Sequence, residues 1–328
     1  MSRIDRGTLV AEAMLAPSVH NVQPARWRLE GADGLLLCED RGCRLAVGDP
    51  DGNDAGISLG AAAEGLRLAA SRHGLAIAKS DEPLPKPSGT LVPIARYRLR
   101  GTCIPADPLC PFVDVRRSWR GDFSPVSAQD RRIAVALAGE DAAVVADPAL
   151  LVEVGRLFDR ASYGFMRETD FRRELVSWMR LSPRHSRWAQ DGLNAEAMAM
   201  SRIEAWGAGL VLGRAFGPLH RLGLAAPLLA EGKKVAGAAA LVVFHRPAGE
   251  TPFESGAHFY RLWLRIEAAG FGGAVLAALA DDADAALRIA LLADVPRGHR
   301  VVSAFRIGKR PAVNAAPRAR RELSEVLV

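Results

Sequence analysis

A loop near the N-terminus groups side chains that could bind a small polar ligand. Residues 16–24 read Ala-Pro-Ser-Val-His-Asn-Val-Gln-Pro, and the two prolines stiffen the loop by fixing their φ angles. Ser18, Asn21 and Gln23 supply hydroxyl and carboxamide groups that could bind the polar edge of a flat heterocycle. The alternative is a turn in which these side chains only cap neighbouring backbone groups.

A second segment, residues 115–125, could bind an anion. Alternate side chains of an extended chain point to the same side, so Arg116, Ser118 and Arg120 would bring two guanidinium groups and a hydroxyl onto one anion. A phosphate dianion suits this arrangement. The alternative is a solvated basic linker, because runs of charge usually face water.

Glycines and cations further along the chain could complete a ligand site. Gly272 and Gly273 follow a predicted helix, and without a Cβ atom their backbone could approach a ring closely and donate hydrogen bonds to it. Lys234 precedes a predicted strand and could stabilise negative charge on such a ring. The basic tail, residues 306–311 and 317–323, could close over a phosphate. The alternatives are a helix cap, a solvated lysine and a plain basic terminus.

An internal repeat predicts how these segments are positioned. Residues 60–74 and 256–270 match without gaps: each begins with Gly-Ala, has leucine at its seventh and ninth positions and ends with glycine. Both show helical apolar spacing, with the final glycine where a left-handed C-terminal cap belongs. A strand-like segment follows each, at 96–99 and 304–307. The recurrence favours two related halves, although alanine- and leucine-rich helices also resemble one another by chance.

The remaining pattern predicts an α+β fold. Strands are expected at 35–38, 142–146 and 240–244, and helices at 7–15, 128–138, 148–166 and 195–212. Two Pro-rich connections, 79–90 and 105–111, lie between the repeats. We therefore expect an N-terminal half, residues 1–111, and a C-terminal half, residues 112–328. Each half is expected to have a central mixed or antiparallel sheet flanked by helices.

Composition excludes several classes of protein. The 328 residues are 49% hydrophobic and 24% charged, which permits a large core and excludes a disordered or fibrous chain. There is no apolar run of membrane-spanning length and no leader, so we expect a cytoplasmic protein without membrane contact. The four cysteines lack zinc-site spacing, and the histidines are scattered. No Walker or Gly-x-Gly-x-x-Gly loop occurs. The net charge of +6 lies in local clusters that suit a small anion equally well, so we expect no nucleic acid partner.

Taken in order, these segments resemble the nitroreductase superfamily, and within it the Acg-type, or tandem, FMN-binding nitroreductase-like proteins. Those proteins run from an Ala-Pro-Ser-x-His-Asn-x-Gln-Pro loop to a Gly-Ala-Ala helix, an Arg-Arg-Ser/Thr-x-Arg segment, a second Gly-Ala helix and a Pro-Arg-x-x-x-Leu-x-x-Val-Leu ending. The corresponding residues here are 16–24, 60–74, 116–120, 256–270 and 317–327. The resemblance spans nearly the whole chain and implies two pseudo-symmetric halves, fused to mimic a nitroreductase dimer, with one FMN at their interface.

The resemblance also implies a set of cofactor-binding residues and no catalytic side chain. The N-terminal loop would contact the isoalloxazine ring, the arginine segment and the tail would contact the phosphate, and Lys234 and the two glycines would contact the pyrimidine side and the N5 edge. The redox chemistry would belong to FMN itself. The implied cofactor-binding residues are Pro17, Ser18, His20, Asn21, Gln23, Arg116, Arg117, Ser118, Arg120, Lys234, Gly272, Gly273 and Arg318.

The implied activity is transfer of electrons from NADH or NADPH to a nitroaromatic, a quinone or a similar small acceptor, by a monomer or homodimer. Two features leave other functions open. Ala25 and Arg26 separate the Gln-Pro pair from Trp27, whereas the family often has Trp directly after it. Residues 180–192 could form a lid over the flavin. The alternatives are a non-catalytic flavin-binding or flavin-sequestering protein, and a flavin-free protein with an interaction or regulatory role.

Overall fold

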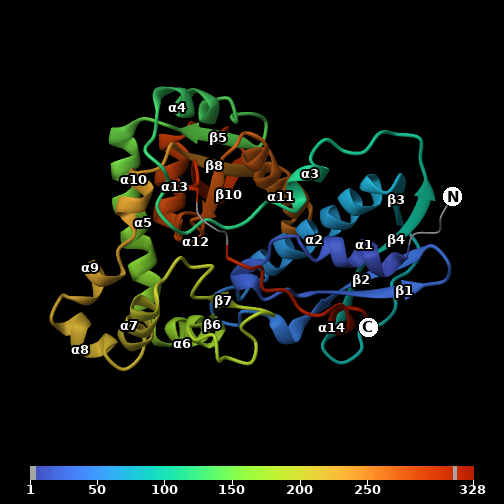
Figure 1. Ribbon diagram of the computed structural model, residues 1–328, viewed down its shortest axis with the longest axis horizontal. Helices are drawn as coiled ribbons and strands as arrows, with labels where there is room; N and C mark the ends of the chain where they lie inside the picture. The colour runs from blue at the N-terminus through green and yellow to red at the C-terminus, as the bar shows by residue number, and fades with distance from the viewer. Residues whose placement is uncertain (1–4, 313–315) are drawn as a thin grey trace.

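The computed structural model describes residues 5–312 and 316–328, which form two four-stranded antiparallel sheets (Figure 1). The expected α+β class is confirmed. The first sheet has the order β1-β2-β4-β3, with β1 (Ala25–Glu30), β2 (Gly34–Asp40), β3 (Leu75–Ser80) and β4 (Leu91–Gly101). The second has the order β5-β8-β10-β9, with β5 (Ala142–Val145), β8 (Ala240–Pro247), β9 (Gly272–Val275) and β10 (His299–Gly308).

Helices and short elements connect and cover these sheets. In the first part of the chain they are α1 (Arg6–Ala13), the 3₁₀ turns η1 (Val19–Asn21) and η2 (Arg41–Cys43), α2 (Asn53–Arg72), α3 (Cys110–Val113) and α4 (Ala128–Val135). Between β5 and β8 they are α5 (Pro148–Arg167), α6 (Thr169–Trp178), the parallel pair β6 (Met179–Arg180) and β7 (Leu193–Asn194), α7 (Arg202–Leu212), α8 (Phe216–Arg221), α9 (Ala225–Leu229) and α10 (Gly232–Ala236). After β8 they are α11 (Pro252–Ala268), α12 (Ala278–Asp281), α13 (Ala283–Leu292) and α14 (Leu323–Val326).

The same order of elements occurs around both sheets. Helix, two strands, helix and two strands follow one another as α1-β1-β2-α2-β3-β4 and again as α4-β5-β8-α11-β9-β10. Both sheets also place their four strands in the same spatial order. The second set differs by a long insertion, residues 148–236, between its first two strands, and by α12 and α13 between its last two. The glycines that end the two repeat helices, Gly74 and Gly270, have the expected left-handed φ of 69° and 82°.

The repeat helices α2 and α11 cross with their backbones in contact. A Cβ atom on Gly60 would overlap the carbonyl oxygen of Phe253, and one on Gly256 would overlap the carbonyl oxygen of Ile57. Each carbonyl belongs to the residue three positions before the glycine of its own helix, so the contact is reciprocal. Only glycine permits this approach. The crossing therefore brings one repeat helix from each half side by side at the centre of the molecule (Figure 1).

The core around the second sheet extends over both of its faces. Strand β8 begins Ala-Leu-Val-Val-Phe-His, and all six residues are buried, as expected of a strand covered on both sides. Phe244 and Phe305 pack with α11 on one face, whereas Leu241 and Val243 pack with α5, α12 and α13 on the other. The first sheet buries Leu35 and Leu37 under α1 and α2.

The C-terminal tail returns to the N-terminal half. Val326 is buried in the core of the first sheet, and Leu327 forms a parallel β-bridge with Trp27. The backbone N–H of Val328 donates to the carbonyl of Trp27 at 2.9 Å. The expected boundary at residue 111 lies within α3, while residues 323–327, which follow that boundary in sequence, pack on the N-terminal half. The tail thereby crosses the interface between the halves.

One expected helix begins later than its apolar pattern indicates. The pattern predicts a helix over 195–212, but residues 195–201 form turns and α7 begins at Arg202. Ser201 accepts a hydrogen bond from the backbone N–H of Glu204, whose carboxylate accepts one from the N–H of Ser201. This capping box fixes the start of the helix. Within the described residues, no helix combines the length and apolarity needed to cross a membrane.

We predict that Gly60→Ala destabilises the protein by about 3 kcal/mol, because the added methyl group must force two helix backbones apart. Urea denaturation of the purified variant measures this loss. Gly164→Ala is the matched control, since Gly164 is an exposed position in α5 whose Cβ would contact nothing within 4 Å. Helix propensity should make the control neutral or slightly stabilising. Equal stability of the two variants would contradict the close crossing.

Candidate functional site

The backbone of the N-terminal loop is held in a rare conformation. His20, Asn21 and Gln23 have positive φ angles of 42°, 56° and 52°, which side-chain-bearing residues rarely adopt. The Ser18 hydroxyl accepts a hydrogen bond from the N–H of Gln23 at 3.0 Å, and Ser58 of α2 accepts one from Val19 at 3.1 Å. Such strain persists only where surrounding contacts enforce it, and it is concentrated at functional sites.

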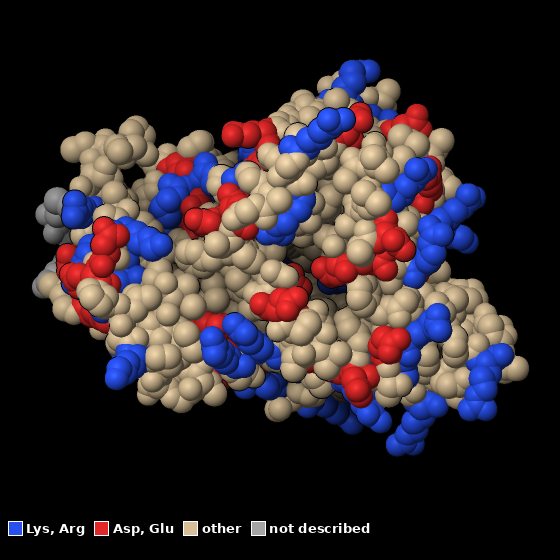
Figure 2. Space-filling model, turned by 180° about the vertical axis from the view of Figure 1, so that it is seen from behind, with Lys and Arg blue, Asp and Glu red and all other residues tan. Residues whose placement is uncertain are grey.

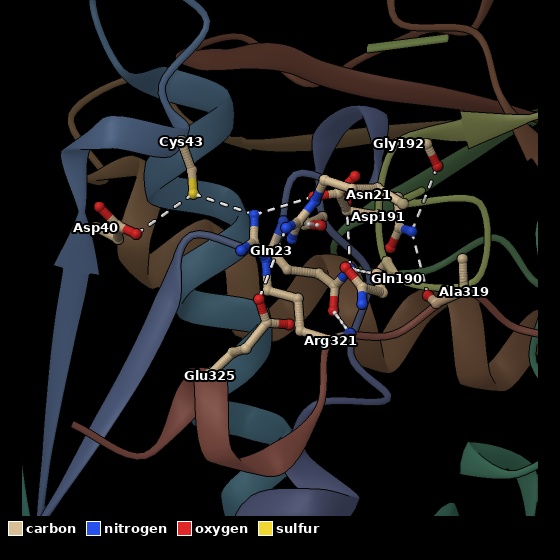
Figure 3. A network of polar contacts seen from close by, with 12 residues as sticks. Asn21, Gln23, Asp40, Cys43, Gln190, Asp191, Gly192, Ala319, Arg321 and Glu325 are labelled. Carbon is tan, nitrogen blue, oxygen red and sulfur yellow. Dashed lines mark hydrogen bonds and ion pairs between the residues drawn. The ribbon is translucent and has the colours of Figure 1, made fainter. Parts of the chain in front are cut away.

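The Asn21 and Gln23 carboxamides hold three chain segments together. Asn21 donates to the carbonyls of Gly192 and Ala319, at 3.4 and 3.2 Å. Gln23 donates to Gln190 at 2.7 Å and accepts from the N–H of Arg321 at 3.1 Å. We call this junction of residues 18–23, 189–192 and 319–321 the clamp (Figure 3). The sequence predicts that these two carboxamides face a ring, whereas here both bind backbone groups.

A buried carboxylate fastens the clamp. Asp191, 1% exposed, forms ion pairs with Arg180 at 2.8 Å, Arg187 at 2.6 Å and Arg321 at 3.1 Å. Arg180 directly precedes residues 181–192, Arg187 lies within that segment, and Arg321 lies on the C-terminal tail. Arg321 also points toward the buried thiol of Cys43, at 3.6 Å (Figure 3). The clamp thus joins the insertion of the C-terminal half to the loop of the N-terminal half.

A group of arginines lies beside the C-terminal end of α1. Arg320 donates to the carbonyls of Met14, Leu15 and Ala16 at 2.7, 3.2 and 3.4 Å, and Arg116 donates to Leu15 at 2.8 Å. The carbonyls at a helix C-terminus carry partial negative charge, which favours cations there. Arg318 donates to the carbonyl of Arg116 at 2.7 Å. Three guanidinium groups therefore meet where the two halves join.

This group contains buried donors without partners among the described residues. Arg116 is 4% exposed, and its guanidinium lies 4.6 Å from the ring centre of Trp263. Its Nε has no hydrogen-bond partner, nor have Arg318 Nε and Trp263 Nε1, and the Tyr260 hydroxyl donates to no described residue. Tyr260 and Trp263 are 0% and 3% exposed. We call Arg116, Arg318, Tyr260 and Trp263 the donor cluster. Unpaired buried donors of this kind suit an acceptor-rich anion.

Burial dominates the electrostatics of these arginines. Burial, followed by the charges of neighbouring arginines, lowers the pKa of Arg318 to about 10 and that of Arg320 to about 9. The pKa of Arg116 is also lowered, mainly by burial, although Tyr260 and Glu267 oppose the shift. Arg318 and Arg320 therefore remain cations at neutral pH. No carboxylate of the described residues forms an ion pair with any of them, so a bound anion would relieve their mutual repulsion.

A second cationic group lies around Arg120. Burial lowers the pKa of Arg306 to about 10, with Arg120 adding to the shift and Glu231 opposing it. Arg306 is 3% exposed, donates to the carbonyls of Trp119 and Gly121, and leaves one guanidinium nitrogen without a partner. The charge of Arg120 also acts on His20, whose pKa falls to about 4 mainly through burial. The sequence predicts that Arg306 lies in a strand and belongs to the basic residues that could close over a phosphate, but nothing in the strand pattern marks it as buried.

The expected convergence of the arginine segment on one anion differs from the structure. Arg116 belongs to the donor cluster, whereas Arg120 faces His20 and Arg306. Ser118, between them, is exposed and forms a β-bridge with Gly273. Arg117 donates to the carbonyl of Ala316 at 3.0 Å. An extended chain rises about 3.3 Å per residue, so the ends of the segment serve two separate groups.

The remaining predicted residues have local partners. Lys234 forms an ion pair with Glu231 at 2.7 Å. Gly273 accepts a hydrogen bond from the N–H of Trp119 at 2.9 Å, and both glycines of β9 pair with β10. A Cβ atom on Gly272 would lie 2.7 Å from the side chain of Arg310, which would have to shift to admit a larger residue. Pro17 lines a small cavity of about 30 Å³, enough for about one water molecule.

At the equivalent positions of the other repeat helix, charged residues satisfy one another. Tyr260 and Trp263 lie four and seven residues after Gly256, and Glu64 and Arg67 lie four and seven residues after Gly60. Arg67 pairs with Glu64 at 2.7 Å, and the remaining contacts, to Asp107 and Arg261, are 2.6 to 2.9 Å long. This ion quartet leaves no free cation for a ligand. Among the described residues, no group of three or more His, Cys, Asp or Glu side chains is arranged to hold a metal.

No protein-family model and no curated protein matches the chain. Similar solved structures include a nitroreductase with bound FMN from Bacteroides fragilis, at 11% identity and a TM-score of 0.34, covering 64% of this chain and 92% of that one. The FMN-dependent nitroreductase NfnB from Mycobacterium smegmatis in complex with NADPH is 18% identical, with a TM-score of 0.37, and the match covers 65% of this chain and 94% of that one. A BluB-like flavoprotein from Clostridium difficile is 13% identical, with a TM-score of 0.36, and the match covers 68% of this chain and 99% of that one. All three TM-scores are below 0.5, so we assign neither family nor activity from these likenesses.

We predict that acid removes a stabilising contribution of His20. The unfolded chain takes up this proton near pH 6.5 but the folded chain only near pH 4, so the contribution is complete above 6.5 and is lost as the pH falls toward 4. Between pH 7 and pH 4 the free energy of unfolding should fall by about 3 kcal/mol more in the wild type than in His20→Gln, as measured in urea. His185→Gln, at an exposed histidine, should follow the wild type. Identical pH profiles for all three proteins would exclude a buried neutral imidazole.

A separate prediction concerns the clamp. Asp191→Ala should cost about 4 kcal/mol in the free energy of unfolding, because it leaves buried guanidinium groups without a counter-charge. Asp170→Ala removes an exposed ion pair with Arg173 and should cost less than about 0.5 kcal/mol. Thermal and urea denaturation measure both losses. Similar losses in the two variants would show that the Asp191 pairs contribute little.

Proposed function

We propose that the chain binds one FMN, with its phosphate at the donor cluster. The observation that supports this is the set of buried donors without partners on Arg116, Arg318, Tyr260 and Trp263. A phosphate dianion offers acceptors to all of them and neutralises cations that have no carboxylate. The chemistry of these donors therefore suits a phosphate. The resemblance in sequence to FMN-binding proteins, and the names of the similar solved structures, agree with this choice.

We further propose that the two halves arose by duplication and act as a fused, nitroreductase-like pair. The repeated element order and the reciprocal glycine contact support this. In such a pair, the strained loop of one half and the arginine segment of the other serve the same ligand. Arg116 contacts the end of α1, and Arg120 acts on His20, so both ends of the segment already reach the N-terminal half.

The proposed activity is an FMN-dependent oxidoreductase that takes electrons from NADH or NADPH and reduces a small acceptor. Bound FMN supplies the hydride and electron chemistry. The chain's residues bind and orient: the donor cluster holds the phosphate, and Arg120 and Arg306 place positive charge where an electron-rich ring requires it. His20 stays neutral at pH 7 and offers a hydrogen bond rather than a charge.

A second function, storage or sequestration of flavin without turnover, is favoured by the clamp. Asp191 and its three arginines fasten residues 189–192 across the loop that would meet the ring. A segment held by buried ion pairs opens at a cost, which would exclude a second substrate. Anaerobic addition of NADPH to the yellow protein separates the two functions, because only an open site allows the 450 nm band to bleach.

The test of FMN binding compares FMN with riboflavin, which lacks the phosphate. We predict that Tyr260→Phe and Arg318→Ala each reduce the preference for FMN over riboflavin by about tenfold or more, because each removes a donor to the phosphate. Fluorescence quenching of each flavin gives the two dissociation constants. Tyr97→Phe, at a buried tyrosine in the core of the first sheet, should leave the preference unchanged. Equal weakening of both flavins would exclude the phosphate assignment, and no flavin binding by the wild type would exclude the function.

A further inference from the structure

The insertion between β5 and β8 carries an apolar surface that no described residue covers. We call residues 201–229, which contain α7, α8 and α9, the arm. On α7, Ile203 is 81% exposed, Trp206 is 71% exposed and Leu210 is 42% exposed. Their spacing of three and four residues places all three on one face of the helix. Residues of this kind are normally buried, so the face is suited to contact a partner.

The rest of the arm adds to this surface. Leu222, Leu224 and Leu228 are 71%, 48% and 60% exposed, and they lie at the end of α8 and in α9. The arm extends away from both sheets at the lower left of Figure 1. Its inner side is anchored by Leu212 and Leu229, which pack on α6 and its surroundings. The exposed face is therefore displayed on a positioned element.

The arm is basic as well as apolar. Three of its arginines are exposed: Arg202, Arg214 and Arg221. None of them forms an ion pair with a carboxylate of residues 5–312 or 316–328. By contrast, Arg187 and Lys234, outside the arm, each form one. The one acidic residue of the arm, Glu204, closes the capping box of α7. Seen from behind, the lobe at the lower right is mainly uncharged, with Lys and Arg side chains along its lower edge (Figure 2).

This charge distribution selects among partners. A symmetric contact between two copies through the arm would bring the same unpaired arginines together, and like charges oppose such a contact. An anionic surface is complementary to them. Tryptophan and large aliphatic residues on one side of a helix, with arginines nearby, are typical of helices that lie in the interface of a bilayer. We propose that the arm docks the protein on anionic lipid surfaces.

Docking of this kind needs no membrane-spanning helix. The exposed groups of the arm would enter the headgroup region, and the arginines would add electrostatic attraction to acidic lipids. The sequence predicts no membrane contact because it contains no long apolar run; in α7 the apolar residues are interrupted by glycine, alanine and glutamate, and only the folded chain shows which ones stay exposed.

The experiment is flotation of the full-length protein with vesicles of phosphatidylcholine, alone or with phosphatidylglycerol. We expect binding only to vesicles that contain phosphatidylglycerol, and a decrease in that binding as salt is raised. Ile203→Asp with Trp206→Asp should weaken it by about tenfold or more. The matched control is Leu287→Asp with Leu291→Asp, which places the same two charges on α13 at leucines that are each 64% exposed. Circular dichroism and thermal unfolding confirm that both variants are folded.

Three outcomes would overturn the proposal. The first is no flotation of the wild type with phosphatidylglycerol vesicles. The second is an equal loss of binding in the arm and control variants, which would assign the binding to overall charge. The third is a concentration-dependent dimer, seen by light scattering, that the arm variant alone abolishes, which would make the arm a contact between copies. None of these outcomes depends on flavin binding.

Discussion

The architecture depends on one backbone contact, the crossing of α2 and α11 at Gly60 and Gly256. Because each glycine rests on a carbonyl of the other helix, the two halves cannot move apart or slide without losing close packing. The crossing also positions the end of α1 beside α2. On one side, Gly65 of α2 lets the end of α1 approach, and that helix end supplies the carbonyls that hold Arg116 and Arg320.

Positive charge near this crossing is held mainly by backbone. Arg116, Arg318 and Arg320 donate to carbonyl groups, which position a guanidinium without neutralising it. Where buried arginines need a counter-charge the chain uses carboxylates instead, as at Asp191 and in the ion quartet. The difference separates arginines that stabilise the fold from arginines that keep their charge available to an anion.

Local pattern was sufficient for much of the fold. Periodic apolar spacing located α2, α5, α11 and the central strands, because burial of one face imposes that spacing on the residues. The start of α7 differed because a serine cap outweighed the apolar pattern. For the candidate site, the sequence singled out the loop and Arg116. It did not identify Tyr260 or Trp263, whose importance comes from the absence of partners in three dimensions. The roles of Asn21 and Gln23 likewise depend on segments about 170 and 300 residues away.

The ion quartet has a consequence for how the molecule would respond to ligand concentration. Two equivalent halves could in principle offer two ligand sites. If one site filled before the other, or if the two were coupled, the saturation curve would be graded or cooperative. Here Glu64, Arg67, Asp107 and Arg261 occupy one position permanently. Under the proposed function, a single chain has only an empty and a full state, and a simple hyperbola describes its occupancy. The quartet, which joins three residues of the N-terminal half to Arg261 of α11, is then free to serve as scaffold, so its charged residues can change together without altering what the donor cluster binds.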